Sequence, residues 1–128
     1  MKNTEKLSCS RKKYLSAIYR LSLERTDVKS TDVAFAAGVS KASTAAMMQR
    51  LSEEGYIEKE FYGRILLTPK GTSEARNIYC KHTAISSFLE KKLGLDHKNA
   101  DSEAFSIVSC ISEDTASALA EYLSGEVQ

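Results

Sequence analysis

The segment from Val33 to Leu51 restricts the possible folds more than any other part of the chain. Its sequence, VAFAAGVSKASTAAMMQRL, predicts two short helices joined by a tight turn at Gly38-Val39-Ser40. Glycine suits the end of a helix, where a left-handed backbone is needed, and Ser40 can cap the start of the second helix. This layout is typical of a helix-turn-helix, whose second helix enters the major groove of DNA.

A short β-hairpin is predicted about a dozen residues later. Its strands are expected at Tyr56-Ile57 and from Arg64 to Leu67, with Tyr62-Gly63 near the tip. Cationic and aromatic side chains are concentrated in this segment: Lys59, Phe61, Tyr62, Arg64 and Lys70. Such a ribbon fits contacts to the sugar-phosphate backbone or the adjacent minor groove, and it completes a winged helix-turn-helix.

The rest of the chain has helical periodicity and helix-capping residues. A first helix is expected over residues 9–25, and Ser30 or Thr31 is expected to be the N-cap of the first helix of the motif. A long helix is expected over residues 70–93, with Pro69 at its start. Two more helices are expected over residues 99–111 and 113–124, with Ser112 as the N-cap of the last one. The predicted fold is therefore mainly α with a small β-wing. A winged helix-turn-helix DNA-binding domain over residues 1–70 is followed by a helical domain over residues 71–128.

Charge and cysteine content suggest the setting in which such a chain works. The formal net charge is only +1, but residues 1–64 hold 12 Lys/Arg against 8 Asp/Glu, whereas residues 65–128 hold 6 against 9. This asymmetry suggests that the basic half binds phosphate groups and that the acidic half has another role. Three cysteines without a CxxC pair indicate reduced thiols. No signal peptide or apolar run of about 20 residues is present, so we expect a soluble, cytoplasmic protein.

The second helix of the motif has one face that packs and one that can meet DNA. Thr44, Met47, Met48 and Leu51 are expected to face inward. The outward residues are Lys41, Ala42, Ser43, Ala45, Ala46, Gln49 and Arg50. Cations and hydroxyl groups at these positions can hold phosphates, but alanine methyl groups can only touch a thymine methyl. Sequence reading should therefore depend on apolar contact and DNA shape, unless Gln49 or Lys41 reaches a base edge.

Five stretches in order resemble one known family: KYLSAIYRL, STDVAFAAGVSKAS, MMQRLSEEGYIEKE, RILLTPKG and KHTAISSFLEKKLGLD. They are similar to the diphtheria-toxin-repressor (DtxR/MntR) family of iron- and manganese-dependent transcriptional regulators. The resemblance runs from about Lys13 to Leu123. The length matches the short members, which lack a C-terminal SH3-like domain.

The resemblance implies a homodimeric repressor that binds a palindromic operator in double-stranded DNA. It assigns base contacts to Ala42 and Ala46, and phosphate contacts to Ser40, Ser43 and Arg50. The complete predicted DNA-binding set is Thr31, Ser40, Lys41, Ala42, Ser43, Ala46, Gln49, Arg50, Tyr62 and Arg64.

The resemblance also implies a Mn²⁺ or Fe²⁺ site formed by the first helix, the long helix and the helix after it. The positions that would supply its ligands are Lys13, Ser16, His82, Ser86, Asp101, Phe105, Val108 and Ser109. Only His82 and Asp101 retain chemistry that Mn²⁺ or Fe²⁺ prefers. We therefore expect metal control to be degenerate or lost, with Lys13 occupying some of the space of the ion.

Two alternatives stay open from the sequence, and a third is considered but not expected. The first is a repressor gated by Mn, Fe or Zn through a rearranged site with His82, Asp101 and a cysteine. A thiol switch through Cys9, Cys110 and His82 is related to it, although buried structural cysteines are the commoner case. The second is a winged-helix module that binds protein. The third, an enzyme, is not expected, because no nucleophile-base set, phosphate loop or HExxH occurs and Glu53-Glu54 and Glu113-Asp114 resemble helix-surface residues.

Overall fold

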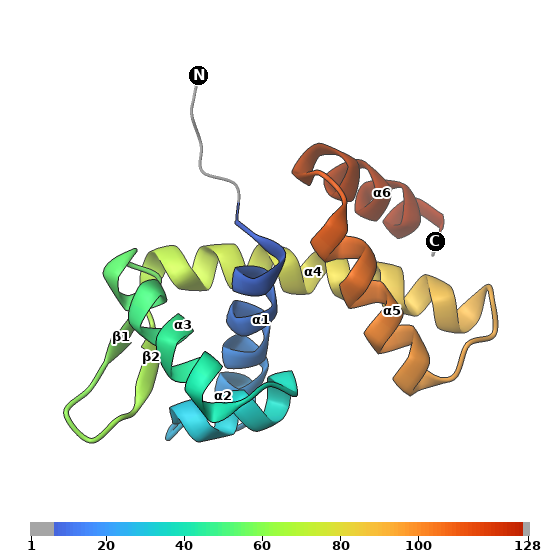
Figure 1. Cartoon of the computed structure of the whole chain (residues 1–128). Coiled ribbons are helices and arrows are strands. Elements are labelled where there is room, and N and C mark those ends of the chain that lie inside the picture. The colour runs from blue at the N-terminus through green and yellow to red at the C-terminus, as the bar shows by residue number, and fades with distance from the viewer. Residues whose placement is uncertain (1–6, 127–128) are drawn as a thin grey trace. The chain divides into compact units, whose positions relative to one another are not determined.

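The computed structural model describes residues 7–126, which form six helices and a two-stranded antiparallel sheet (Figure 1). In chain order these are α1 (Cys9–Glu24), α2 (Ser30–Ala37), α3 (Lys41–Glu53), β1 (Ile57–Lys59), β2 (Ile65–Leu67), α4 (Pro69–Lys91), α5 (His97–Cys110) and α6 (Glu113–Glu126). The predicted fold class is confirmed. None of these helices combines the length and apolar character that crossing a membrane requires.

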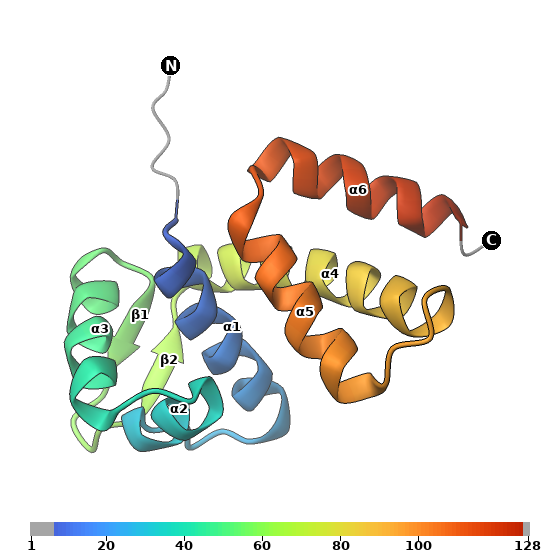
Figure 2. The ribbon, with the colours of Figure 1, turned by 45° about the vertical axis from the view of Figure 1, so that its right-hand side comes forward.

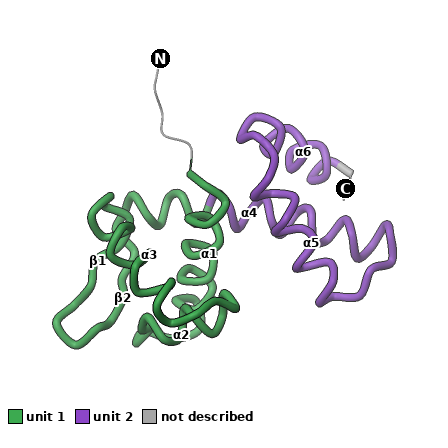
Figure 3. The backbone as a smooth tube through the Cα atoms, viewed as in Figure 1, with its two compact units in different colours: residues 1–76 green, residues 77–128 purple. Residues whose placement is uncertain are grey.

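The chain divides into two compact units, residues 1–76 (unit 1) and residues 77–128 (unit 2), with the boundary inside α4 (Figure 3). The main apolar core belongs to unit 1. Its buried members are Tyr14, Leu15, Ala17, Ile18, Val28, Val33, Met47, Met48, Leu51, Tyr56, Ile57, Ile65 and Ala75. This core joins α1, α2 and α3 to the hairpin and to the first turns of α4, so the position of α3 is set by packing against α1, α2 and β1.

The turn between α2 and α3 forms as the sequence predicts. Gly38 ends α2 with φ +69°, and the Val39 N–H donates to Ala34 O at 3.1 Å. Ser40 Oγ then accepts from the Ser43 N–H at 3.0 Å and caps α3. A left-handed glycine followed by a serine cap thus fixes the change of direction between the two helices (Figure 2).

The start of α2 differs from the prediction, because neither Ser30 nor Thr31 is its N-cap. Lys29 occupies that position, and its backbone N–H donates to the Asp32 carboxylate at 2.9 Å. Arg25 pairs with the same carboxylate at 2.5 Å. These two bonds, the Arg25 bond first, hold the pKa of Asp32 below its ordinary value. The Asp32 carboxylate in the first turn therefore stabilises the start of α2, because the side chain of Lys29 cannot act as a cap.

The hairpin is tied to the helices by a third extended segment. β1 and β2 pair with Ile57 opposite Leu67 and Lys59 opposite Ile65. On the other edge of β2, the Ile65 N–H donates to Val28 O at 2.8 Å, and Lys29 and Arg64 form an isolated bridge. The hairpin loop projects from unit 1 (Figure 1), while β2 is held on both edges, by β1 and by the Val28-Lys29 segment.

The junction between β2 and α4 requires glycine at position 71. Thr68 N–H donates to Tyr56 O at 3.1 Å, Thr68 Oγ1 donates to Gly55 O at 2.6 Å, and the same oxygen accepts from the Gly71 N–H at 3.0 Å. A Cβ on Gly71 would lie 1.9 Å from Tyr56 O. The LTPKG stretch therefore docks the start of α4 directly on the backbone beyond α3.

Unit 2 consists of the later turns of α4 with α5 and α6. Its buried apolar residues are Ile78, Ile85, Leu89, Ala100, Ala104, Val108, Ala116 and Leu123. Ser112 caps α6 as predicted, with Thr115 N–H at 3.1 Å from its Oγ. Helix α5 begins at His97 rather than near Asn99, because Asp96 Oδ1 accepts from the Asn99 N–H at 3.0 Å and starts the helix earlier.

Candidate nucleic-acid interface and metal positions

Helix α3 has the two faces that the sequence predicts. Thr44, Met47, Met48 and Leu51 are buried in the unit 1 core. The seven outward residues, Lys41, Ala42, Ser43, Ala45, Ala46, Gln49 and Arg50, are all exposed. Because the buried residues lock the helix by packing, the exposed face is presented in a fixed orientation.

Groups suited to phosphate gather at the start of α3. Ser40 is exposed, as are Lys41 and Ser43, and the first N–H groups of a helix carry partial positive charge. Thr31, one of the predicted DNA-binding residues, is exposed on the first turn of α2. Its neighbour Ser30 begins the helix. Exposed hydroxyl groups therefore lie at the starts of both helices of the helix-turn-helix, with the Lys41 ammonium at the start of α3.

Gln49 is already engaged within α3. Its Nε2 donates to Glu53 Oε2, one turn later, at 2.9 Å. A bidentate contact to adenine needs both the amide nitrogen and the amide oxygen of glutamine. Gln49 can therefore read a purine only by exchanging the Glu53 bond, which weakens the case for direct reading by this residue.

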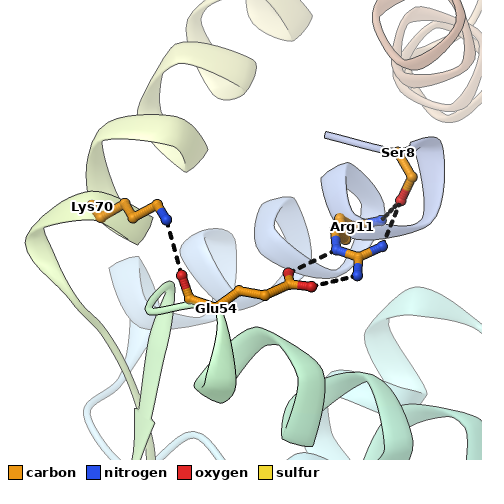
Figure 4. A network of polar contacts seen from close by, with 4 residues as sticks. All are labelled: Ser8, Arg11, Glu54 and Lys70. Carbon is orange, nitrogen blue, oxygen red and sulfur yellow. Dashed lines mark hydrogen bonds and ion pairs between the residues drawn. The ribbon is translucent and has the colours of Figure 1, made fainter. Parts of the chain in front are cut away.

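A polar network fixes the far end of α3 (Figure 4). The Arg11 guanidinium from α1 makes two bonds to the Glu54 carboxylate, Nε to Oε1 at 2.8 Å and Nη2 to Oε2 at 2.6 Å. Lys70 Nζ donates to Glu54 O at 2.9 Å and lies 4.4 Å from the centre of the Tyr56 ring. Arg11 also binds Ser8 Oγ at 3.3 Å. The hydrogen bonds from Arg11 hold the pKa of Glu54 below its ordinary value.

This network corrects two sequence interpretations. Glu54 is not an ordinary surface residue, because its carboxylate joins α3 to α1 through a planar two-point contact. Lys70 is not part of the wing, because it lies in α4 and its ammonium group points at the end of α3. No local signal identifies the Arg11–Glu54 pair, since its members lie 43 residues apart.

Arg64 braces the wing. Its Nε donates to Glu60 Oε1 at 2.8 Å across the loop, and its Nη1 reaches Thr26 O at 3.4 Å. The bond to the Glu60 carboxylate raises the pKa of Arg64 and lowers that of Glu60. Tyr62, beside it in the loop, is exposed. The two predicted wing residues therefore differ: Arg64 supports the loop, and Tyr62 extends from it.

The metal positions of unit 2 hold one imidazole and one carboxylate. His82 is 2% exposed, and its Nε2 lies 2.8 Å from the backbone oxygen of Asp101 and 3.2 Å from Asp101 Oδ1. Because a carbonyl oxygen can only accept, this nitrogen carries the proton and donates. It cannot ligate an ion in the same arrangement. The ring of Phe105 packs edge-on against the imidazole, with ring centres 5.9 Å apart.

The surrounding residues do not complete a divalent site. Phe105 and Val108 have no ligand atoms, and Ser86 and Ser109 supply hydroxyl groups where carboxylates or imidazoles are required. Among the described residues, neither unit gathers three His, Cys, Asp or Glu side chains that could hold a metal ion. The donors present do not fit a Mn²⁺ or Fe²⁺ centre of the kind that the resemblance implies.

Next to His82, the buried Lys81 forms an ion pair with Glu113, whose side chain is exposed. The Lys81 side chain binds Glu113 Oε2, at the start of α6, and Asn77 Nδ2 donates to the same oxygen at 2.8 Å. Glu113 is exposed in the first turn of α6, as expected from the sequence, and it also accepts two bonds from α4. A carboxylate at a helix N-terminus is also favoured by the helix dipole.

Two further expectations are wrong. Lys13 is exposed on α1, so it does not take the place of an ion. Cys9, Cys80 and Cys110 are also exposed, which contradicts their interpretation as buried structural residues.

Comparison with known proteins agrees with the division of the chain. Residues 6–65 match the family model "Iron dependent repressor, N-terminal DNA binding domain". Residues 68–125 match the model "Iron dependent repressor, metal binding and dimerisation domain". Neither description is that of an enzyme.

Two individual proteins that match this chain are HTH-type transcriptional regulators. An uncharacterised HTH-type transcriptional regulator of Methanocaldococcus jannaschii is 35% identical over 109 residues, which cover 84% of this chain and 87% of the relative. The HTH-type transcriptional regulator MntR of Bacillus pumilus is 31% identical over 85 residues, 66% of this chain and 58% of that protein.

A solved structure shares the fold. The crystal structure of T. acidophilum IdeR superposes with a TM-score of 0.75 at 22% identity and covers 97% of this chain and 56% of that one. This chain thus spans little more than half the length of the Bacillus and T. acidophilum proteins. The two matched models account for nearly all of it, and the chain belongs to the iron-dependent repressor family that its sequence motifs resemble.

Proposed function

We propose that this chain is a homodimeric, sequence-specific DNA-binding transcription regulator, with α3 lying in the major groove. The observation that carries the proposal is the exposed face of α3, which is held by a buried core and begins with exposed hydroxyl and ammonium groups. The predicted division into a DNA-binding domain over residues 1–70 and a dimerisation domain over residues 71–128 is part of it. Membership in a repressor family supports both roles.

Phosphate contacts would position the helix. Ser40, Lys41 and Ser43 are exposed at the start of α3, and Arg50 is exposed near its end. Thr31 offers a hydroxyl at the start of α2. Contacts of this kind fix the register of a protein on DNA but carry no sequence information by themselves.

Base reading would come from small apolar groups. Ala42 and Ala46 are exposed on the outward face of α3, with Ala45 beside them. A methyl group can distinguish thymine through its 5-methyl but makes no hydrogen bond. Discrimination by α3 is then modest, and the spacing of two half-sites in a palindromic operator would add to it.

We further propose that this regulator no longer depends on Mn²⁺ or Fe²⁺. The support is chemical: His82 donates to Asp101, and the neighbouring positions hold apolar or hydroxyl groups. A single imidazole with one carboxylate would leave such a cation mostly bound by water. The alternative is a metal-gated repressor with a rearranged site around His82 and Asp101.

Fluorescence anisotropy with the full chain and a random 30-base-pair duplex tests DNA binding. We expect an affinity that falls steeply with salt. Arg50→Ala should weaken binding and reduce the salt slope by about 1. Lys98→Ala, which removes an exposed cation from α5, is the matched control and should change neither. Salt-independent or absent binding would instead favour a protein-interaction module.

The same titration in EDTA and in added Mn²⁺ or Fe²⁺ tests metal control. We expect equal affinities with and without metal. A requirement for micromolar Mn²⁺ or Fe²⁺ that His82→Ala abolishes would establish the metal-gated alternative and refute the loss of metal control.

A further inference from the structure

The exposed face of α3 has a central stripe that runs along almost the whole helix. Its members are Ala42, Ala46, Gln49 and Glu53, which follow one another at intervals of four, three and four residues. Residues at these intervals lie on one side of an α-helix, one above the other. All four are exposed. The two alanines to which the resemblance assigns base contacts are therefore followed, over the next two turns, by two polar side chains.

Gln49 and Glu53 form a hydrogen-bonded pair on this stripe. The Gln49 Nε2 donates to Glu53 Oε2 at 2.9 Å. Because the amide is neutral, this bond orients the carboxylate without cancelling its negative charge. Glu54, the next residue, differs, since its carboxylate binds Arg11 of α1. Glu53 therefore presents an oriented hydrogen-bond acceptor on the exposed face of α3.

The cations of α3 lie beside the central stripe rather than on it. At about 100° per residue, Lys41 and Arg50 fall on opposite sides of the line from Ala42 to Glu53. Cations in these places can bind phosphates on both sides of a groove, because the phosphates border the base edges. A helix held in this way turns its central stripe, and Glu53 with it, toward the bases.

A carboxylate in the major groove distinguishes between bases. Cytosine presents an amino donor there, whereas guanine presents two acceptors, and thymine presents one acceptor and a methyl group. A carboxylate can accept from the cytosine amino group but is repelled by the guanine acceptors. The short alanine side chains let α3 approach the bases closely, which brings the longer side chain of Glu53 within reach of them.

We propose that Glu53 is a specificity-determining residue that accepts a hydrogen bond from cytosine in the major groove, and that Gln49 is its positioning residue. This inference rests on the proposed DNA-binding function and deepens it. Glu53 lies about 10 Å along the helix axis from Ala46, so its base pair is about three steps from the thymine that Ala46 touches. Helix α3 then reads two places in each half-site, thymine methyl groups through its alanines and an amino group through Glu53.

Selection of duplexes from a random pool, followed by anisotropy titrations with the full chain, tests the inference. Wild type should select cytosine at one fixed position of each half-site and bind it about tenfold more tightly than guanine there. Glu53→Gln should change this preference to adenine, because glutamine pairs with the amino group and N7 of adenine. Glu53→Ala should abolish the preference. Preferences at the other positions should stay as in wild type.

Two further variants separate base reading from positioning and from charge. Gln49→Ala should weaken the preference for cytosine and leave the other preferences intact, which a general loss of helix stability would not do. Glu24→Gln removes an exposed carboxylate from the end of α1 and is the matched charge control, so it should keep every preference of wild type. Because the altered side chains are exposed, all variants should melt at the wild-type temperature.

The outcomes distinguish this inference from the proposed function. If Glu53→Gln and Glu24→Gln tighten binding to every duplex equally and keep all preferences, Glu53 only repels phosphates, and the inference is overturned although the protein binds DNA. The inference is also overturned if wild type selects duplexes without a fixed cytosine. If Gln49→Ala keeps the full cytosine preference, Gln49 does not position Glu53. If wild type binds no duplex, the proposed function and the inference are both wrong.

Discussion

The two units of this chain differ in what their family-like residues do. In unit 1, each part of the family-like pattern makes a structural contact: Thr68 caps α4, Gly71 allows the backbone of Tyr56 to approach, and Ser40 caps α3. In unit 2, positions that resemble metal ligands hold Phe105 and Val108, which pack instead. Residues that build the helix-turn-helix fold are therefore present, whereas several positions at which the resemblance implies metal ligands hold apolar or hydroxyl side chains.

The difference teaches that folding and control can rest on separate residues. A capping serine or a tightly packed glycine cannot be changed without loss of local structure. A metal ligand can be replaced by an apolar residue that gains burial, and Asp101 accepts from Nε2 of the imidazole that is retained.

The largest effect is expected from Gly71→Ala. Its Cβ would lie 1.9 Å from Tyr56 O and 3.2 Å from Leu67 Cδ2, so α4 or the backbone must shift. We expect a loss of about 3 kcal/mol of unfolding free energy in urea, because a backbone atom cannot move aside as a flexible side chain can. Gly125→Ala in α6, where nothing lies within 4 Å, is the control and should be neutral or gain about 0.5 kcal/mol.

The stability of unit 2 can be tested through the ion pair between the buried Lys81 and the exposed Glu113. Glu113→Gln leaves the Lys81 ammonium, whose residue is 7% exposed, without a carboxylate partner and should cost about 1–2 kcal/mol in urea unfolding. Lys81→Met fills a similar volume and should cost less, and the double variant should recover most of the loss. Asp114→Asn, on the next residue of α6, is the control. A Lys81→Met variant as unstable as Glu113→Gln would show that the pair itself stabilises unit 2.

Local signals explain why much of the fold could be predicted. The sequence correctly predicts the helix end at Gly38 and the helix caps at Ser40 and Ser112. Such caps and left-handed turns involve residues that are only a few positions apart. The buried face of α3 follows from helical periodicity. The predicted starts of α2 and α5 are wrong because the capping groups differ from those expected. The Asp32 carboxylate accepts from the Lys29 N–H, and Asp96 lies before the residues that show helical periodicity in α5.

Long-range contacts account for what sequence reasoning missed. The Arg11–Glu54 pair and the approach of Gly71 to Tyr56 both depend on how separate elements pack. The sequence places Lys70 with the wing because it closely follows β2, but its ammonium group donates to the backbone oxygen of Glu54. The DNA contacts of α3 stay a prediction, since an exposed face has many uses and only binding measurements decide among them.

Two substitutions of Ser40 are expected to have smaller effects, and together they separate the role of this residue in folding from its role in DNA binding. Ser40→Ala removes the acceptor for the Ser43 N–H and should cost about 1 kcal/mol of stability. Ser40→Asp keeps an acceptor and should keep the stability, but its charge repels phosphate and should weaken binding to the random duplex severalfold. Equal DNA affinity for Ser40→Asp and wild type would remove Ser40 from the proposed interface.

The smallest effect is expected from the pH dependence of the Arg11–Glu54 pair. The hydrogen bonds from Arg11 lower the pKa of Glu54 from its ordinary value of 4.5, so the folded state binds its proton less readily than the unfolded state. The stabilisation is therefore present above pH 4.5 and is lost as the pH falls through the lower folded value. Because both side chains are partly exposed, Glu54→Gln should cost only about 0.5 kcal/mol at neutral pH.

Urea unfolding of wild type and Glu54→Gln across this acidic range tests the assignment. The difference between the two should shrink as the pH falls, because protonation removes from wild type what the substitution has already removed. Glu58→Gln, at an exposed carboxylate on β1, should instead follow the wild-type curve. If the difference between wild type and Glu54→Gln stays constant with pH, the stabilisation comes from packing of the side chain on α1 rather than from its charge.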